Sequence, residues 1–218
     1  MVIFDCNGVL VDSEPLATAI VSQEFIRAGF ALTPDIVARY FTGRRPADMF
    51  TEVEIAAGRK LPPDFAATVT SATLRRFRAE LRATKHASYA LSWLRGPKCV
   101  ASSSSFDRIR VSLESTDLIR FFEPNLFSAG DVPKGKPAPD LFLHVAGKMG
   151  VHPRECIVVE DSPVGVAAGV AAGMTVIGFV GGSHAGGHLT NHLRTAGASA
   201  VISDLRALKS TIIDLRGW

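Results

Sequence analysis

Residues 2–14 read VIFDCNGVLVDSE, and this stretch decides the fold. It opens with three apolar residues, Val2-Ile3-Phe4, and these are followed at once by a carboxylate, Asp5. A short continuous apolar run that ends at a polar residue is typical of a strand buried on both faces, as in a parallel sheet. The stretch therefore predicts a buried first strand that brings Asp5 to the end of a sheet.

Four further apolar runs have the same continuous character and are interpreted as strands. Helix-like segments lie between the runs, for example at 106–118 and 140–149. Strands alternating with helices predict an α/β fold with a doubly wound, Rossmann-like parallel sheet. Ser162 and Pro163 mark one helix start, since serine caps a helix and proline is tolerated in its first turn. The four runs span 99–101, 156–159, 175–180 and 200–202.

The stretch from residue 13 to residue 82 interrupts this alternation. It carries helix-period patterns and no convincing strand, and Pro34 and Pro62-Pro63 mark helix boundaries within it. We therefore expect an all-helical cap domain at 13–82. It would be inserted into an α/β catalytic core formed by 1–12 and 83–218.

Composition excludes several other classes of protein. The 218 residues are 47% hydrophobic and 21% charged, which is ordinary for a soluble globular protein. A net charge of +3 is too small to indicate nucleic-acid binding. No apolar run approaches the roughly 20 residues that span a bilayer, and the first residues do not resemble a secretion signal. We expect a cytoplasmic monomer or weak homodimer that contacts neither nucleic acid nor membrane, with its three cysteines buried as small hydrophobic residues.

Polar side chains follow the predicted strands at the ends where active sites of open α/β sheets form. Asp5 follows the first strand, Ser102 the second, and Glu160-Asp161 the third, while Lys136 lies in a loop before a helix. Each residue alone is explained more simply as a cap, turn or surface residue. Together, however, the carboxylates would repel one another unless a divalent cation lay between them, and hard oxygen ligands favour Mg²⁺. The set predicts phosphoryl transfer, with Asp5 as the attacking group and Lys136 and Ser102 on the phosphate.

Four motifs follow one another in order along nearly the whole chain. They are DCNGVLVDSE at 5–14, SS at 102–103, GKPAPD at 135–140 and VVEDSPVG at 158–165. Their content and order resemble the haloacid dehalogenase superfamily. The likeness is to the branch that contains β-phosphoglucomutase and small sugar-phosphate phosphatases, whose helical cap is inserted after the first motif. The resemblance implies a Mg²⁺-dependent phosphatase acting on a small phosphorylated metabolite such as a sugar phosphate.

The resemblance also implies roles for the matching residues on the metal side of the site. Asp5 corresponds to the nucleophile, which becomes an aspartyl phosphate, and to a Mg²⁺ ligand. Asn7 would bind the metal through its backbone carbonyl. Asp161 would bind it directly, and Glu160 directly or through water.

The remaining matches imply contacts to the phosphate and the substrate. Ser102 and Lys136 would hold the phosphoryl group, helped by the amide of Ser103, and Gly8 would permit the tight turn that leads into the cap. Substrate contacts are expected from the cap at Gly43-Arg44-Arg45.

Asn7 departs from the family pattern. Hydrolases and mutases of the family carry a second aspartate there, which protonates the leaving group and then activates water. An amide cannot shuttle a proton near neutral pH, and losing a general acid/base costs roughly 10²–10⁴ in rate. The sequence is compatible with a native Asn7 in a slow or repurposed enzyme, and with an introduced substitution of the kind that traps an intermediate. Either origin predicts binding of metal and phosphoester with impaired turnover.

Two alternative functions stay open at this stage. A phosphomutase is the nearest rival, although mutases of this branch carry an arginine where this chain has Pro46. The other is a non-catalytic protein that binds a phosphorylated metabolite. The histidines His184, His188 and His192 recur every four residues, but glycines nearby weaken any helix, so we interpret them as part of a flexible surface loop and not as a metal site.

Overall fold

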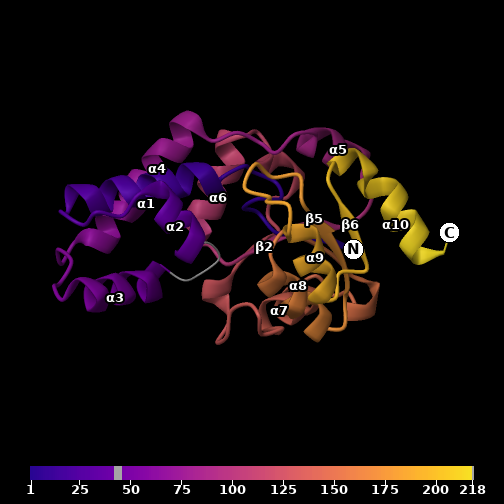
Figure 1. Cartoon of the computed structure of the whole chain (residues 1–218). Coiled ribbons are helices and arrows are strands. Elements are labelled where there is room, and N and C mark those ends of the chain that lie inside the picture. Colours follow the sequence, from indigo (N-terminus) through magenta and orange to yellow (C-terminus); the bar gives the residue numbers. More distant parts are fainter. Residues whose placement is uncertain (42–45, 218) are drawn as a thin grey trace. The chain divides into compact units, whose positions relative to one another are not determined.

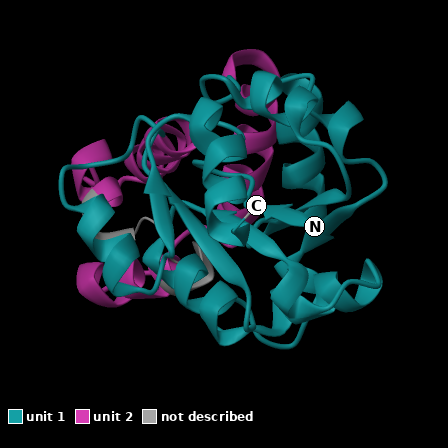
Figure 2. Cartoon of the chain, turned by 90° about the vertical axis from the view of Figure 1, so that its right-hand side faces the viewer, with its two compact units in different colours: residues 1–12, 82–218 teal, residues 13–81 magenta. Residues whose placement is uncertain are grey.

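A computed structural model describes residues 1–41 and 46–217 of the chain. The chain divides into two compact units, coloured separately in Figure 2. One comprises Met1–Asp12 and Arg82–Trp218, and the other is Ser13–Leu81.

The first unit contains a six-stranded sheet in which every pair of neighbouring strands is parallel, in the order β3-β2-β1-β4-β5-β6. The predicted fold class, a doubly wound α/β sheet, is confirmed. One strand, β3, was not predicted, because it contributes only two apolar residues to the sequence pattern. The strands are β1 Val2–Phe4, β2 Lys98–Ser102, β3 Leu126–Ser128, β4 Ile157–Glu160, β5 Thr175–Phe179 and β6 Ala200–Ile202.

Helices cover both faces of this sheet. Helices α7, α8 and α9 gather on one side of the strands in Figure 1, and each packs against strands of the sheet. The capping role of Ser162 is confirmed, since its Oγ accepts a hydrogen bond from the Gly165 amide at 3.0 Å. The helices of this unit are α5 Ala87–Trp93, α6 Phe106–Ser115, α7 Asp140–Lys148, α8 Pro163–Ala171, α9 Leu189–Thr195 and α10 Leu208–Arg216.

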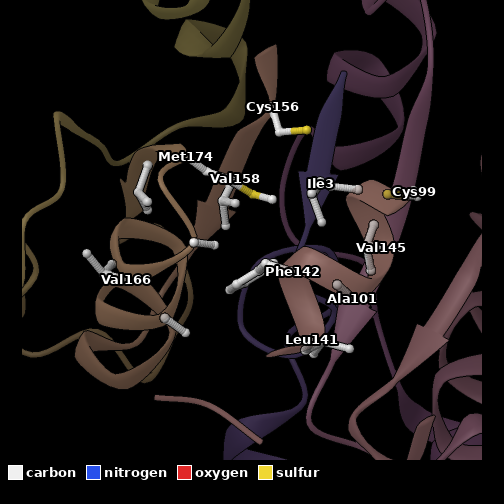
Figure 3. Close-up of a cluster of buried hydrophobic side chains, with 14 of the residues drawn as sticks. Ile3, Cys99, Ala101, Leu141, Phe142, Val145, Cys156, Val158, Val166 and Met174 are labelled. Atoms are coloured by element: carbon white, nitrogen blue, oxygen red, sulfur yellow. The ribbon is translucent and has the colours of Figure 1, made fainter. Parts of the chain in front are cut away.

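The main hydrophobic core lies between the sheet and α7 and α8, as Figure 3 shows. Ile3 belongs to this cluster, where it is fully buried together with Phe142 of α7 and Val158 of β4. Because side chains alternate along a strand, the neighbouring Phe4 faces the opposite side of the sheet, where its ring meets that of Phe122 edge-on at 5.9 Å. Burial on both faces explains why the first strand has no polar position.

The strand order places a topological switch point between β1 and β4. From β1 the chain moves outward to β2 and β3, and then crosses back to β4 on the other side of β1. Phe4 pairs with Val159 in the register of these two strands, so Asp5 and Glu160 follow at the same level. A crevice at such a switch point is where open α/β sheets bind their ligands.

The second unit is made of the helices α1 Glu14–Arg27, α2 Pro34–Phe41, α3 Pro46–Ala57 and α4 Phe65–Glu80. Its small core is built around Phe25, whose ring lies 4.8 Å from that of Phe65. Pro34 begins a helix, as the sequence predicts. None of the helices of the described chain is long and apolar enough to cross a membrane.

Close packing of α8 on the sheet depends on Gly169. An added Cβ there would lie 2.7 Å from Cγ2 of Val176. Gly169→Ala is therefore expected to lower the free energy of unfolding by about 1–3 kcal/mol through overpacking, as measured by urea denaturation. The matched control is Gly147→Ala in α7, where no heavy atom lies within 4 Å of the new Cβ, so stability should rise by about 0.5–1 kcal/mol. Shifts of the same sign in both variants would contradict this packing argument.

Candidate active site

The centre of the site is a buried lysine that bridges two carboxylates. Nζ of Lys136 lies 2.6 Å from Oδ1 of Asp5 and 2.5 Å from Oε1 of Glu160. The three side chains are 5%, 9% and 1% exposed, respectively. Charge-assisted hydrogen bonds of this length are strong in a poorly hydrated interior. The structure therefore brings together three of the residues that the sequence predicts.

The loop before α7 delivers Lys136 to this position. Its ammonium also donates to the backbone carbonyl of Ala101, in β2, at 3.2 Å. The same nitrogen lies 5.1 Å from the ring centroid of Phe142, the third residue of α7. Three donors of an ammonium are thus directed at three oxygens, which fixes the side chain between β1, β2 and β4.

Negative charge in the site exceeds what one ammonium neutralises. The pKa of Asp5 is raised from 3.8 to about 8, first by burial and then by repulsion from Glu160 and Asp161, against the opposing attraction of Lys136. The pKa of Lys136 is raised above its usual range, because the attraction of Asp5 and Glu160 outweighs burial. Three ionised carboxylates and one ammonium would leave a net charge of −2, which favours a cation as a further ligand.

Glu160 is held by the start of α8. Its Oε2 accepts hydrogen bonds from the Ser162 amide at 3.1 Å and from Ser162 Oγ at 2.9 Å. Gly165 makes room for it, because a Cβ at that position would lie 1.9 Å from Oε1 of Glu160. The positive end of the helix dipole also favours a carboxylate there. Glu160 is thus both orientated and electrostatically compensated.

Asp161 contacts a residue that the sequence interpretation placed elsewhere. Oδ2 of Asp161 lies 2.9 Å from Nε2 of His184, whose side chain is 17% exposed. Gly8 packs directly against the Asp161 carboxylate. Its φ is 75°, and an added Cβ would lie only 1.9 Å from Oδ2 of Asp161. Gly8 is therefore required both by its backbone conformation and by lack of space.

Asn7 points into a network of serines. Its side-chain amide donates to Ser104 Oγ at 2.8 Å. The Ser104 amide donates to Oγ of Ser102, the last residue of β2, at 3.2 Å, and the Ser104 carbonyl accepts from Ser128 Oγ at 2.7 Å. Ser102 is buried, whereas Ser103 is exposed. Sequence reasoning missed Ser104 and Ser128, although the run of serines at 102–105 was visible.

Whether these residues suit Mg²⁺ is decided by their donor chemistry and charge. Carboxylate oxygens are the ligands that Mg²⁺ prefers, and repulsion from Glu160 and Asp161 adds to the effect of burial in raising the pKa of Asp5. Within residues 1–41 and 46–217, however, no three His, Cys, Asp or Glu side chains are arranged as a metal-binding group. Lys136 stands between Asp5 and Glu160, and His184 holds Asp161. The residues fit a Mg²⁺ ion in type and charge.

Two expectations about surface residues have different outcomes. The interpretation of His184 as part of a flexible surface loop is wrong, because its imidazole is largely buried against Asp161. The sequence could not show this, since it depends on a contact between β4 and the loop after β5. His188 and His192 are exposed, as expected, but the loop prediction is wrong for His192, which lies in helix α9 after the N-cap residue His188. The cap residues Gly43-Arg44-Arg45 lie outside the described residues.

Comparison with known proteins gives the same family as the motifs. The family model of haloacid dehalogenase-like hydrolases matches residues 1–173. The 6-phosphogluconate phosphatase of Escherichia coli is 34% identical over 165 residues, which are 75% of each chain.

Solved structures agree over the full length. A conserved haloacid dehalogenase-like protein of Agrobacterium tumefaciens is 35% identical with a TM-score of 0.86, covering 99% of this chain and 98% of that one. A haloacid dehalogenase family hydrolase of Deinococcus radiodurans, with bound phosphate and sodium, is 29% identical with a TM-score of 0.79, covering 98% and 94%. The chain belongs to the haloacid dehalogenase-like hydrolase family.

Proposed function

We propose that this protein is a Mg²⁺-dependent phosphatase of a small phosphorylated metabolite, with a sugar phosphate as the substrate class. The observation that carries the proposal is the buried Lys136 ammonium bridging Asp5 and Glu160 at the switch point of the sheet. The phosphatase activity named for the Escherichia coli relative supports the substrate class. The structure of the Deinococcus radiodurans relative contains bound phosphate and sodium, which supports a protein that binds phosphate and a cation.

In the first half-reaction, a carboxylate oxygen of Asp5 attacks phosphorus in line with the ester oxygen. A bond forms between Asp5 and phosphorus, the ester P–O bond breaks, and the leaving oxygen takes a proton from water, because the Asn7 amide cannot supply one. Lys136 and a bound Mg²⁺ would offset the charge of the phosphoryl oxygens. Asp5 must be ionised to attack. The attraction of Lys136 lowers the pKa of Asp5 and so favours the ionised, nucleophilic form.

In the second half-reaction, water attacks phosphorus, and phosphate leaves with Asp5 restored. This step needs a base to take a proton from water. Asn7 cannot accept it, and in the structure its amide donates to Ser104. Turnover is therefore impaired. With a good leaving group, hydrolysis of the aspartyl phosphate is slowed more than its formation, because only hydrolysis still needs the missing base. Substrate selectivity is proposed for the cap residues 43–45.

A phosphomutase and a non-catalytic binding protein remain distinguishable by experiment. A mutase would require a bisphosphorylated activator and would return an isomerised monophosphate. A binding protein would form no phosphoenzyme at all. The retained Asp5, Lys136 and Glu160, with their short contacts, favour a protein that still forms the aspartyl phosphate.

Restoring a carboxylate at position 7 should restore turnover. Asn7→Asp is expected to raise Mg²⁺-dependent release of phosphate from an aryl phosphate by about 10²–10⁴, because it supplies the missing general acid/base. The measurement is steady-state release with and without chelator. Asn191→Asp, on an exposed position of α9, is the control and should leave the rate unchanged. If chain and variant are both inactive with Mg²⁺ present, the phosphatase proposal fails.

The chain itself should accumulate a phosphoenzyme. With an aryl phosphate, whose leaving group needs little protonation, the first half-reaction outruns hydrolysis when position 7 is an amide. Intact-mass measurement should then show one added phosphoryl group that hydroxylamine removes. Asp5→Asn should abolish the adduct, and Asn7→Asp should reduce it. An adduct that survives in Asp5→Asn would place the nucleophile elsewhere.

The metal-free protein should lose stability as the pH rises. Unfolded Asp5 ionises near pH 3.8 and folded Asp5 near about 8, so its contribution is complete below the lower value and is lost as pH rises through the upper one. Urea denaturation in chelator between about pH 5 and about pH 8 should show this decrease. The slope should flatten in Asp5→Asn, and Mg²⁺ should flatten it in the parent. Equal slopes for parent and variant in chelator would contradict the assignment.

A further inference from the structure

His184 reaches the site from a loop that the family motifs do not include. It lies after β5, in a turn closed by a hydrogen bond from the Ala185 amide to the Gly182 carbonyl at 3.0 Å. From there its Nε2 meets Oδ2 of Asp161 at 2.9 Å. Asp161 directly follows β4. Two neighbouring strands thus present the two partners of this contact at the same end of the sheet.

The loop that carries His184 is fixed to the first motif. Ser183, the residue before it, donates to Oδ1 of Asp12 twice, from its amide at 3.1 Å and from its Oγ at 2.8 Å. Gly181 is packed so closely that a Cβ there would lie 2.4 Å from the carbonyl oxygen of Ser203. The contacts of its own loop therefore position the imidazole independently of its contact with Asp161.

Two glycines provide the space for the imidazole. A Cβ on Gly8 would lie 2.8 Å from Cε1 of His184, and one on Gly182 would lie 2.7 Å from both Cε1 and Nδ1. Gly182 also lies close to Gly8, since its Cβ position is 2.9 Å from the Gly8 carbonyl oxygen. The ring thus sits in a slot between the turn after Asn7 and its own loop, with only one nitrogen directed at the carboxylate.

We propose that His184 is a positioning residue for metal binding, which holds the Asp161 carboxylate in the orientation that Mg²⁺ requires. This inference rests on the proposed function, together with the role as a direct Mg²⁺ ligand that the family resemblance implies for Asp161. A donor on one carboxylate oxygen restricts rotation of the group, so that the carboxylate is already ordered before the cation arrives. Hydrogen-bond partners of ligating groups typically contribute about 10–100-fold to metal affinity or activity.

The test is direct measurement of Mg²⁺ affinity by titration calorimetry, with Mn²⁺ binding followed by electron paramagnetic resonance. His184→Ala is expected to weaken the binding of both metals by about 10–100-fold. His184→Gln keeps a donor at the reach of Nε2 and should bind Mg²⁺ nearly as well as the parent. His184→Asn is polar but too short, and should resemble the alanine variant. His188→Ala, at an exposed histidine of the same region, is the matched control.

Each outcome decides the inference. If the parent binds Mg²⁺ and His184→Ala binds it equally well, His184 has no positioning role, although the proposed function stands. Tighter binding by His184→Ala would show that the imidazole competes with the metal, which also overturns the inference. If the parent binds no Mg²⁺, the metal part of the proposed function fails together with it. Should His184→Ala fail to fold, the comparison of His184→Gln with His184→Asn decides the same question.

Discussion

A lysine ammonium buried between two carboxylates organises this molecule. Removing such charges from water is costly unless they are paired and their remaining hydrogen-bonding groups are satisfied. Here Lys136 meets Asp5, Glu160 and a backbone carbonyl in one place. The arrangement demands that β1, β2, β4 and the loop before α7 all be in their final positions. Function and fold therefore depend on the same contacts.

The site carries an excess of buried negative charge, which is a cost in the absence of a ligand. Glu160 is compensated by Ser162 and the start of α8, and Asp161 by His184. Burial and the two neighbouring carboxylates raise the pKa of Asp5 to about 8, against the attraction of Lys136. A site of this kind gains most from a cation and a phosphate bound together, because the cation stabilises the ionised Asp5 and the ammonium stabilises the phosphate.

Asn7 is a neutral side chain beside this charged cluster. Its amide is accommodated by Ser104, which is itself tied to Ser102 at the end of β2. An aspartate at the same position would add a further negative charge close to the site. An amide cannot shuttle a proton near neutral pH, and in this structure it donates a hydrogen bond to the serine network.

Much of the fold was predictable because a short strand that is buried on both faces appears in the sequence as a continuous apolar run. The runs at β1, β4 and β5 are continuous and apolar, and Ser162-Pro163 marks the start of α8. Strand β3 was missed because Leu126-Phe127 is too short to stand out from its surroundings. The motif residues at the strand ends were also predictable, since the position after a parallel strand defines which edge they reach.

From the sequence alone, the alternation of strands and helices was predictable, and Asp5, Lys136, Glu160 and Asp161 could be selected as candidate reactive residues. Only the tertiary structure decided which partner each group has. His184 meets Asp161 across two strands, and Ser104 meets Asn7 across two loops. Such pairings depend on sheet order and on the space left by Gly8 and Gly182. Local patterns record which faces are buried, but not which distant side chains the folded chain brings within hydrogen-bonding distance.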